Sequence, residues 1–413
     1  MRFLFSVALL CAAATAAPVS AQTPTVITSL TDALRIGEDN AARLRAADAG
    51  LAGAGGALMQ AGVRPNPELF VDAENFAGSK SYSGTQSLEW TAGLSQRIEI
   101  GGKRTARISE AQAGLTQAGH QRDLEALSLR ADIARTYIRV LASARRVELA
   151  DRQKDNAATI ASAVDARVEA GKEAAVQTQR ADILRATAGM AAQKARGAYQ
   201  ASLAELAALL NRPAGSLQLQ TGWLDEIGAV PDIAPDEASL AVNPKYALIT
   251  AAIERARAGI AVATAAAVPD PTLRAGFRRY NDDDSSAIVV GVSVPIPVFD
   301  RNRGAILEAR QSLIRAEAEQ EAARLEILGD LAKSRTAVLT AYQQVQTLKS
   351  AVEPAADRAL SAARDGYQTG KFDFLNLLDA QRTRFEIEEQ LAAALEEYHL
   401  ARIALTTLVG RVE

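Results

Sequence analysis

Two stretches of the sequence carry the same proline motif. Pro65 to Leu69 reads Pro-Asn-Pro-Glu-Leu, and Pro269 to Leu273 reads Pro-Asp-Pro-Thr-Leu, 204 residues later. Further matches follow each motif at offsets of 198 or 199: Gly93 to Ser95 with Gly291 to Ser293, Glu110 with Glu308, Gly171-Lys172 with Gly370-Lys371, and Tyr199 with Tyr398. Offsets this constant indicate that the chain is an internal duplication.

Each copy contains the same succession of elements. We expect a helix (31–62 and 236–267), two alternating segments, a long helical run (104–168 and 303–366), a Gly-Lys break and a return helix. The expected boundaries are a signal peptide (1–21), a first repeat (22–212, β-hairpin 67–100), a connector (213–235) and a second repeat (236–413, β-hairpin 271–298). A 65-residue helix is about 100 Å long at 1.5 Å per residue, so the fold class is mainly α, with long hairpins and a small β part.

Composition limits the possible functions. Aromatic residues make up 5% of the chain and charged residues 23%, with a net charge of -3. Few aromatics and mixed charges are typical of long helices packed through small side chains. The near-neutral charge gives no indication of a nucleic-acid partner.

The N-terminus has the features of an export signal. Arg2 precedes an apolar run from Phe3 to Ala17, and the small residues before Gln22 predict cleavage near Ala21. Lipidation at Cys11 is the alternative, but Leu10 occupies the preceding position, where processing favours Gly or Ala. Cys11 is the sequence's one cysteine, so we expect neither disulfides nor thiolate chemistry in the mature chain.

The segments between the helices alternate with a period of two, as amphipathic strands do. We expect strands over 68–76, 88–100, 272–280 and 288–298. The apolar face, expected to face membrane lipid, contains Trp90, Leu94, Val290, Val292 and Val294. The polar face, expected to face a lumen, contains Glu89, Arg97, Arg274 and Arg278. A half-buried strand in a soluble sheet has the same period, and the export signal favours the membrane interpretation.

Four strands cannot close a barrel, and an open sheet edge is unstable in lipid. If these segments cross a membrane, the chain must therefore form an oligomer. Two chains would give eight strands with a filled interior, whereas three would give twelve strands and a pore.

The whole mature sequence resembles the TolC family of outer-membrane efflux channels, in its duplicated order of helix, Pro-x-Pro, hairpin and long helix. The phrases from Ser95 to Arg104 and from Pro295 to Gly304 resemble its heavy-metal, CzcC-like branch. The resemblance implies a homotrimer in the outer membrane with a twelve-stranded β-barrel and a periplasmic α-helical tunnel. It also implies a periplasmic adaptor protein and an inner-membrane pump of the resistance-nodulation-division (RND) type as partners.

The resemblance also assigns roles to the two Gly-Lys breaks and the helices after them. The adaptor-docking turns would contain Val168, Gly171 and Lys172 in the first copy, and Tyr367, Gly370 and Lys371 in the second. A periplasmic gate would lie six and nine positions after each glycine, at Gln177 and Arg180 and at Asn376 and Asp379. Asp379 is the one acidic residue among these four, so each subunit would contribute a single gate carboxylate.

No catalytic constellation is recognisable in the sequence. His120 and His399 each lie alone on a helical run, where packing or solvation explains them, and Asp282 to Asp284 fit a polar hairpin tip. We therefore expect no enzyme activity, no cofactor and no metal site in the chain itself, and we expect the pump to select the cargo. Heavy-metal export is the predicted function, with drug or protein export, or a periplasmic coiled-coil adaptor, as alternatives.

Overall fold

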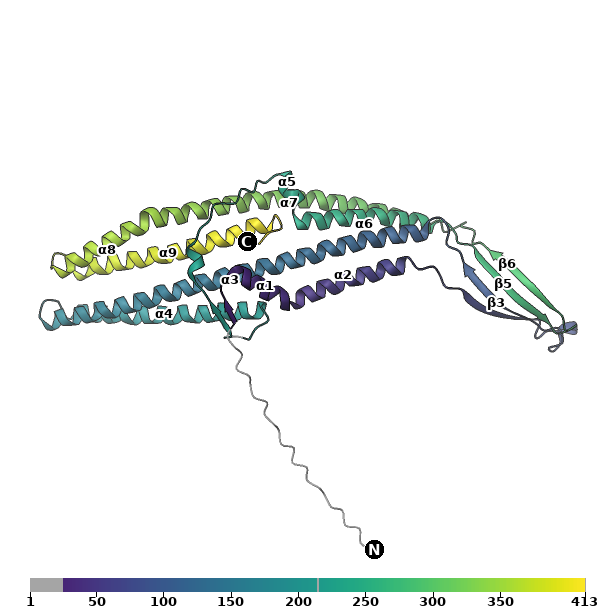
Figure 1. Cartoon of the computed structure of the whole chain (residues 1–413), viewed down its shortest axis with the longest axis horizontal. Coiled ribbons are helices and arrows are strands. Elements are labelled where there is room, and N and C mark those ends of the chain that lie inside the picture. The colour runs from purple at the N-terminus through teal and green to yellow at the C-terminus, as the bar shows by residue number, and fades with distance from the viewer. Residues whose placement is uncertain (1–24, 214, 413) are drawn as a thin grey trace, which may run out of the picture.

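The computed structural model describes residues 25–213 and 215–412, and the expected signal peptide lies outside them. The molecule is elongated (Figure 1). Long helices run along most of its length, the main sheet lies at one end, and the turns α3–α4 and α8–α9 lie at the other. This arrangement confirms the predicted fold class of long helical hairpins with a small β part.

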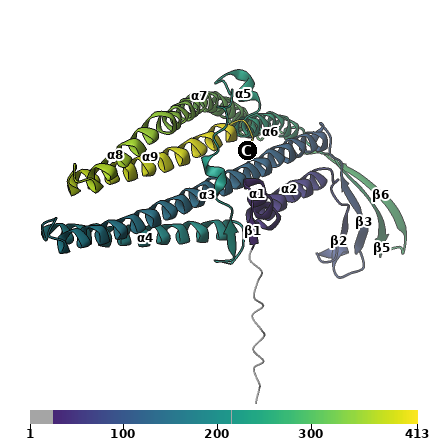
Figure 2. The same cartoon turned by 60° about the vertical axis from the view of Figure 1, so that its left-hand side comes forward.

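The first copy follows the predicted order of elements. Its members are α1 (Leu30–Asn40), α2 (Ala42–Ala61), β2 (Glu68–Glu74), the 3-10 turn η1 (Lys80–Tyr82), β3 (Glu89–Arg97), α3 (Lys103–Glu169) and α4 (Val176–Leu209). The predicted first helix is two helices, because Ala41 has an extended conformation with ψ of 117°. Figure 2 shows that α1 and α2 run in different directions.

The second copy repeats this order. It contains α5 (Glu237–Ala241), α6 (Pro244–Ala266), β5 (Thr272–Tyr280), β6 (Ser286–Ser293), α7 (Arg303–Thr347), a π-helical turn η3 (Leu348–Val352), α8 (Glu353–Gln368) and α9 (Phe374–Thr407). Two prolines modify the predicted helices. Pro244 begins α6 beside the cap residue Asn243, and Pro354 lacks the N–H that a continuous helix needs, so the long run contains a π turn.

The main sheet has the strand order β2-β3-β5-β6, with all neighbours antiparallel. Three strands end earlier than predicted. The difference is largest for β6, which ends at Ser293 because Pro295 and Pro297 have no N–H for a ladder. Within the described residues, the outer edges of β2 and β6 have no partner strand.

The sheet has one apolar face and one polar face, as predicted. Directly opposite residues share a face, and Leu69, Leu94, Ala275 and Val290 form one such row across all four strands. Leu69 is 75% exposed and Val290 is 74% exposed, so this single chain leaves the apolar face uncovered. Among the described residues, no helix combines the length and the apolar character that crossing a membrane requires.

The main core lies in the middle of the molecule, where the two copies meet. Ile133 and Tyr137 of α3 and Tyr398 of α9 are fully buried there. The segment between the copies packs onto this core: β4 (Leu217–Leu219) pairs in parallel with β1 (Thr25–Ile27), and the 3-10 turn η2 (Gly222–Asp225) follows. The sequence analysis did not anticipate this small sheet.

Candidate docking turns and gate

Both Gly-Lys turns end a helix in the same way. Gly171 and Gly370 have φ of 68° and 74°, a left-handed conformation that glycine adopts without strain. In the first turn, the Lys172 N–H donates to the Arg167 carbonyl at 2.8 Å, and in the second the Lys371 N–H donates to the Gly366 carbonyl at 2.8 Å. These bonds close Schellman motifs, and both lysine side chains remain exposed.

A small hydrophobic cluster joins the two turns. It contains Tyr367, Phe374 and Leu377 of the second copy with Val164 of α3, and Val168 packs against it. The rings of Tyr367 and Phe374 lie 6.1 Å apart. The predicted turn residues Val168 and Tyr367 are therefore brought together by packing.

Arg167 adds a polar connection between the turns that the sequence analysis did not predict. Its guanidinium carbon lies 4.6 Å from the centroid of the Tyr367 ring, and its Nη1 donates to the Tyr367 carbonyl at 3.3 Å. Its Nε also lies 3.5 Å from Glu173 Oε1. Burial raises the pKa of the Tyr367 hydroxyl, which has no hydrogen-bond partner among the described residues.

Three of the four residues at the predicted gate positions lie in different environments. Asp373 caps α9 by accepting from the Asn376 N–H at 3.0 Å and from Asn376 Nδ2 at 2.7 Å, so Asn376 has a capping role. Gln177 is half-buried, and its Oε1 has no partner in the described structure. Asp379 is exposed and makes no ion pair within 4 Å among the described residues.

A network of ion pairs lies next to Asp379 and connects the two copies. Arg384 of α9, 15% exposed, contacts Glu353 at 3.3 Å and Glu388 at 3.1 Å, and it also pairs with Asp357 at 2.5 Å. Arg152 of α3 contacts the same Glu388 at 3.7 Å. Asp379, Arg152 and Arg384 line one cavity of about 830 Å³ between the hairpins. Sequence periodicity did not reveal this network, because its partners come from three helices.

At the other end of the molecule, the predicted lumen residues share the polar face of the sheet. Arg278 of β5 contacts Glu89 at 3.1 Å and reaches across β3 to Glu74 at 2.7 Å. The Arg274 guanidinium lies 4.5 Å from the Phe70 ring centroid. Arg97, on the same face, lines a cavity at the base of the sheet.

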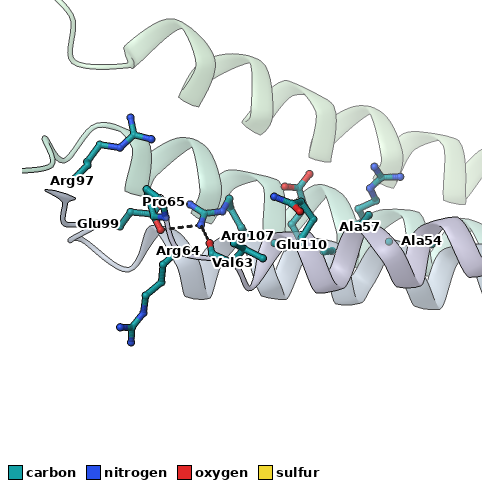
Figure 3. A pocket seen from close by; sticks show the side chains of 14 residues that line it. Ala54, Ala57, Val63, Arg64, Pro65, Arg97, Glu99, Arg107 and Glu110 are labelled. Atoms are coloured by element: carbon teal, nitrogen blue, oxygen red, sulfur yellow. Dashed lines mark hydrogen bonds and ion pairs between the residues drawn. The ribbon is translucent and has the colours of Figure 1, made fainter. Parts of the chain in front are cut away.

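That basal cavity, of about 660 Å³, lies between α2, α3 and α6. Figure 3 shows Arg107 directed at Glu99 and at the Val63 carbonyl, while Arg64 extends away from them. Arg107 Nη2 donates to Glu99 Oε2 at 2.9 Å, so this ion pair fixes the start of α3 against the end of β3. Among the described residues, no group of three or more His, Cys, Asp or Glu side chains is arranged to hold a metal ion.

Comparison with known proteins agrees with this architecture. The family model described as outer membrane efflux protein matches residues 37–212 and again 237–411. The chain is 32% identical over 363 residues to the cobalt-zinc-cadmium resistance protein CzcC of Cupriavidus metallidurans, covering 86% of this chain and 84% of that protein. It is 30% identical over 389 residues to the pyoverdine export outer membrane protein OpmQ of Pseudomonas putida, covering 90% and 82%.

The fold is also similar to that of a solved transmembrane channel. The crystal structure of CusC superposes with a TM-score of 0.78 at 17% identity, over 92% of this chain and 91% of that chain. At this identity the likeness shows the fold alone. Because the family model matches most of the sequence, in two copies that correspond to the duplication, the chain belongs to the outer membrane efflux protein family.

Proposed function

We propose that three copies of this chain form an outer-membrane channel that exports heavy-metal cations as part of a tripartite RND efflux system. The observation that carries the proposal is the position of the open sheet. Its exposed apolar face and its charged polar face lie at one end of helical hairpins that are long enough to extend the channel into the periplasm.

The chain acts as a passive conduit in this proposal. The polar face contains Glu89, Arg274 and Arg278 and faces the lumen, while Val290 and Val292 face lipid. The transported cation is cargo and the RND pump provides the energy, so catalysis is not required of this subunit. The first 21 residues are the cleaved signal, and residues 213–235 connect the two repeats.

The partners meet the channel at the end farthest from the sheet. The turns that contain Lys172 and Lys371 present exposed cations to the periplasmic adaptor protein. Just inside this rim, Asp379 contributes one gate carboxylate from each subunit, with Asn376 and Gln177 beside it. Cations attracted to a carboxylate ring enter an otherwise nonselective pore more readily.

The proposed cargo follows from the relative whose name records cobalt, zinc and cadmium resistance, at 32% identity over most of both chains. The similarity to a pyoverdine export protein favours a second candidate, export of pyoverdine.

A deletion strain would test both functions. We expect cells that lack the chain to become more sensitive to cobalt, zinc and cadmium salts. Restoring the wild-type chain should return their tolerance to the original level. Unchanged metal tolerance together with reduced pyoverdine secretion would support the second candidate. Light scattering of the purified protein in detergent should give three chains per particle. A monodisperse monomer with intact strand content would contradict the channel.

A further inference from the structure

Two arginines lie close together on the polar face of the sheet, at the end nearest the helices. Arg97 is the last residue of β3 and lies opposite Thr272 of β5, and Arg274 follows two residues later on β5. The two arginines are therefore diagonal neighbours, about 7–8 Å apart and within reach of one ligand. Both are exposed, and neither makes an ion pair within 4 Å among the described residues. We call them the basal arginines.

The carboxylates next to the basal arginines already have partners. Arg107 Nη2 donates to Glu99 Oε2 at 2.9 Å, and Lys103 Nζ lies 2.7 Å from Asp270 Oδ1. Farther along the same face, Arg278 is neutralised by two carboxylates. The basal arginines are therefore an excess of positive charge that the surrounding side chains leave uncompensated.

Glu68 of β2 is the remaining carboxylate at this level of the polar face. It lies opposite Ser95 of β3, and Arg274 lies opposite Ser95 on the other side. Since neighbouring strands are about 4.8 Å apart, the backbones of Glu68 and Arg274 are separated by about 10 Å. Glu68 makes no ion pair within 4 Å in the described part of the chain. This level of the face therefore has two unpaired cations and one distant carboxylate.

The Arg274 guanidinium is held in place by an aromatic ring. Its central carbon lies 4.5 Å from the centroid of the Phe70 ring. The ring itself lies over Gly93, where an added Cβ would come within 2.8 Å of Phe70 Cζ, so the glycine provides the space for it. A guanidinium stacked on a ring keeps its N–H groups free in its own plane, where they can donate to a second group.

We propose that the basal arginines bind a small oxyanion of the phosphate or carboxylate class on the wall of the lumen. Guanidinium groups donate paired hydrogen bonds to such anions. The duplication does not account for the two cations, because the equivalent residues of the other copy are Pro295 and Phe70. The inference rests on the proposed channel and adds an anion site to it. In a trimer, the bound anions would offset a ring of arginines that otherwise repels the cationic cargo.

The test measures binding of inorganic phosphate to the purified protein in a phosphate-free detergent, from the broadening of the phosphorus NMR line at neutral pH and low salt. Phosphate should bind saturably to the wild type, and citrate should displace it. Arg97→Gln and Arg274→Gln should each weaken binding about tenfold, because each removes a charge-assisted donor. Arg97→Lys keeps the charge and loses the planar fork, so its affinity should lie between those of Arg97→Gln and the wild type.

Two control variants separate a local site from a general effect of charge. Arg64→Gln removes the same charge from another residue that lines the basal cavity. Figure 3 shows that the side chains of Arg64 and Arg97 extend in opposite directions, so this variant should bind phosphate like the wild type. Glu68→Gln should bind phosphate about twofold more tightly, because it removes a negative charge about 10 Å from the site.

The reversal potential in planar bilayers gives a second measurement. Added phosphate should shift the wild-type channel toward cation selectivity, because the bound anion offsets the basal arginines. The double variant Arg97→Gln with Arg274→Gln should show no such shift. A shift of equal size in both proteins would mean that phosphate acts elsewhere and would overturn the site.

The outcomes separate this inference from the proposed function. Equal phosphate affinity in the wild type, Arg97→Gln and Arg274→Gln would overturn the anion site, as would the absence of phosphate binding to the wild type. An equal loss in Arg64→Gln would also overturn it, because the effect would then follow net charge alone. Both basal arginines belong to one chain, so the titration is decisive even for a monomer. A monomer by light scattering would contradict only the proposed channel.

Discussion

Arg167 of the first repeat and Tyr367 of the second hold the two periplasmic turns together. The guanidinium of Arg167 stacks 4.6 Å from the Tyr367 ring centroid and also donates to the Tyr367 carbonyl at 3.3 Å. A cation over an aromatic face contributes about 0.5–2 kcal/mol, depending on solvent exposure. The contact therefore couples two segments 200 residues apart at the proposed adaptor-binding end.

We expect Arg167→Ala to loosen this end of the molecule. Loss of the stacking and the carbonyl bond should accelerate backbone hydrogen exchange in residues 363–377 by about fivefold, equivalent to roughly 1 kcal/mol of local stability. Tyr367→Phe is the matched control, because it keeps the ring and removes a buried hydroxyl that has no partner in the described structure. Its exchange should equal or fall below that of the wild type. Unchanged exchange in Arg167→Ala would show that the cluster alone joins the turns.

The two exposed turn lysines should matter for transport and not for folding. Changing both Lys172 and Lys371 to Glu leaves the Schellman bonds intact, because these use the backbone. We expect normal trimers and reduced metal efflux in cells, since charged rim contacts govern encounter and register. The control variant changes Lys194 and Lys333 to Glu. These two lysines are exposed but lie away from the turns, so the control has the same net charge as the turn variant. Wild-type efflux in the turn variant would exclude docking through these lysines.

The two faces of β6 should respond differently to charge. Val292→Arg places a cation on the face proposed to meet lipid, at a cost of about 2–4 kcal/mol near the bilayer midplane. Ser293→Arg introduces an arginine at the next position of the strand, on the polar face. We expect a strong loss of trimer in outer-membrane fractions for the first variant and yields near wild type for the second. Equal yields would contradict the assignment of the faces.

The periodic parts of this fold were predictable, and the parts set by tertiary contacts were not. Strand β5 has the predicted limits, since Thr272 to Tyr280 alternates without interruption. The π turn before Pro354 and the break at Ala41 interrupt continuous helical patterns. Strand β1 has three residues, too few for any period to identify.

The same limit applies to the candidate sites. The repeat located both glycine turns, because a left-handed helix end has a sequence signature in Gly-Lys. The Arg384 network and the Arg167–Tyr367 contact had no such signature, because they unite residues from different helices. The role of Asn376 as a capping partner also became visible only beside Asp373.

His399 should make the stability of the core depend on pH. The side chain is 1% exposed, stacks 4.4 Å from the Trp223 ring and lies 3.0 Å from the Leu224 carbonyl through Nε2. Burial lowers the pKa of His399 to about 4, below the ordinary value of 6.5. Between these values the unfolded chain binds a proton and the folded chain does not, so stability is full above pH 6.5 and falls as the pH approaches 4.

We expect the wild type to lose roughly 2 kcal/mol of stability between pH 7 and pH 5 through this residue. His399→Gln retains a donor for the Leu224 carbonyl and does not titrate, so it should remove that part of the pH dependence. Thermal unfolding followed by circular dichroism at the two pH values measures the difference. If the two proteins lose the same amount of stability between pH 7 and pH 5, His399 is accessible to protons in the folded chain.

Asp379 provides the test of the gate. Its carboxylate is exposed, makes no ion pair within 4 Å among the described residues and borders the cavity beside the Arg384 network. If three copies surround the pore, Asp379→Ala should widen the closed state and raise single-channel conductance without affecting assembly. Asp379→Asn separates charge from size: conductance should stay low, whereas preference for cations, measured as the reversal potential in a salt gradient, should fall because a carboxylate ring attracts cations. If both variants match the wild type in conductance and selectivity, Asp379 is a solvated helix carboxylate and the constriction lies elsewhere along α9.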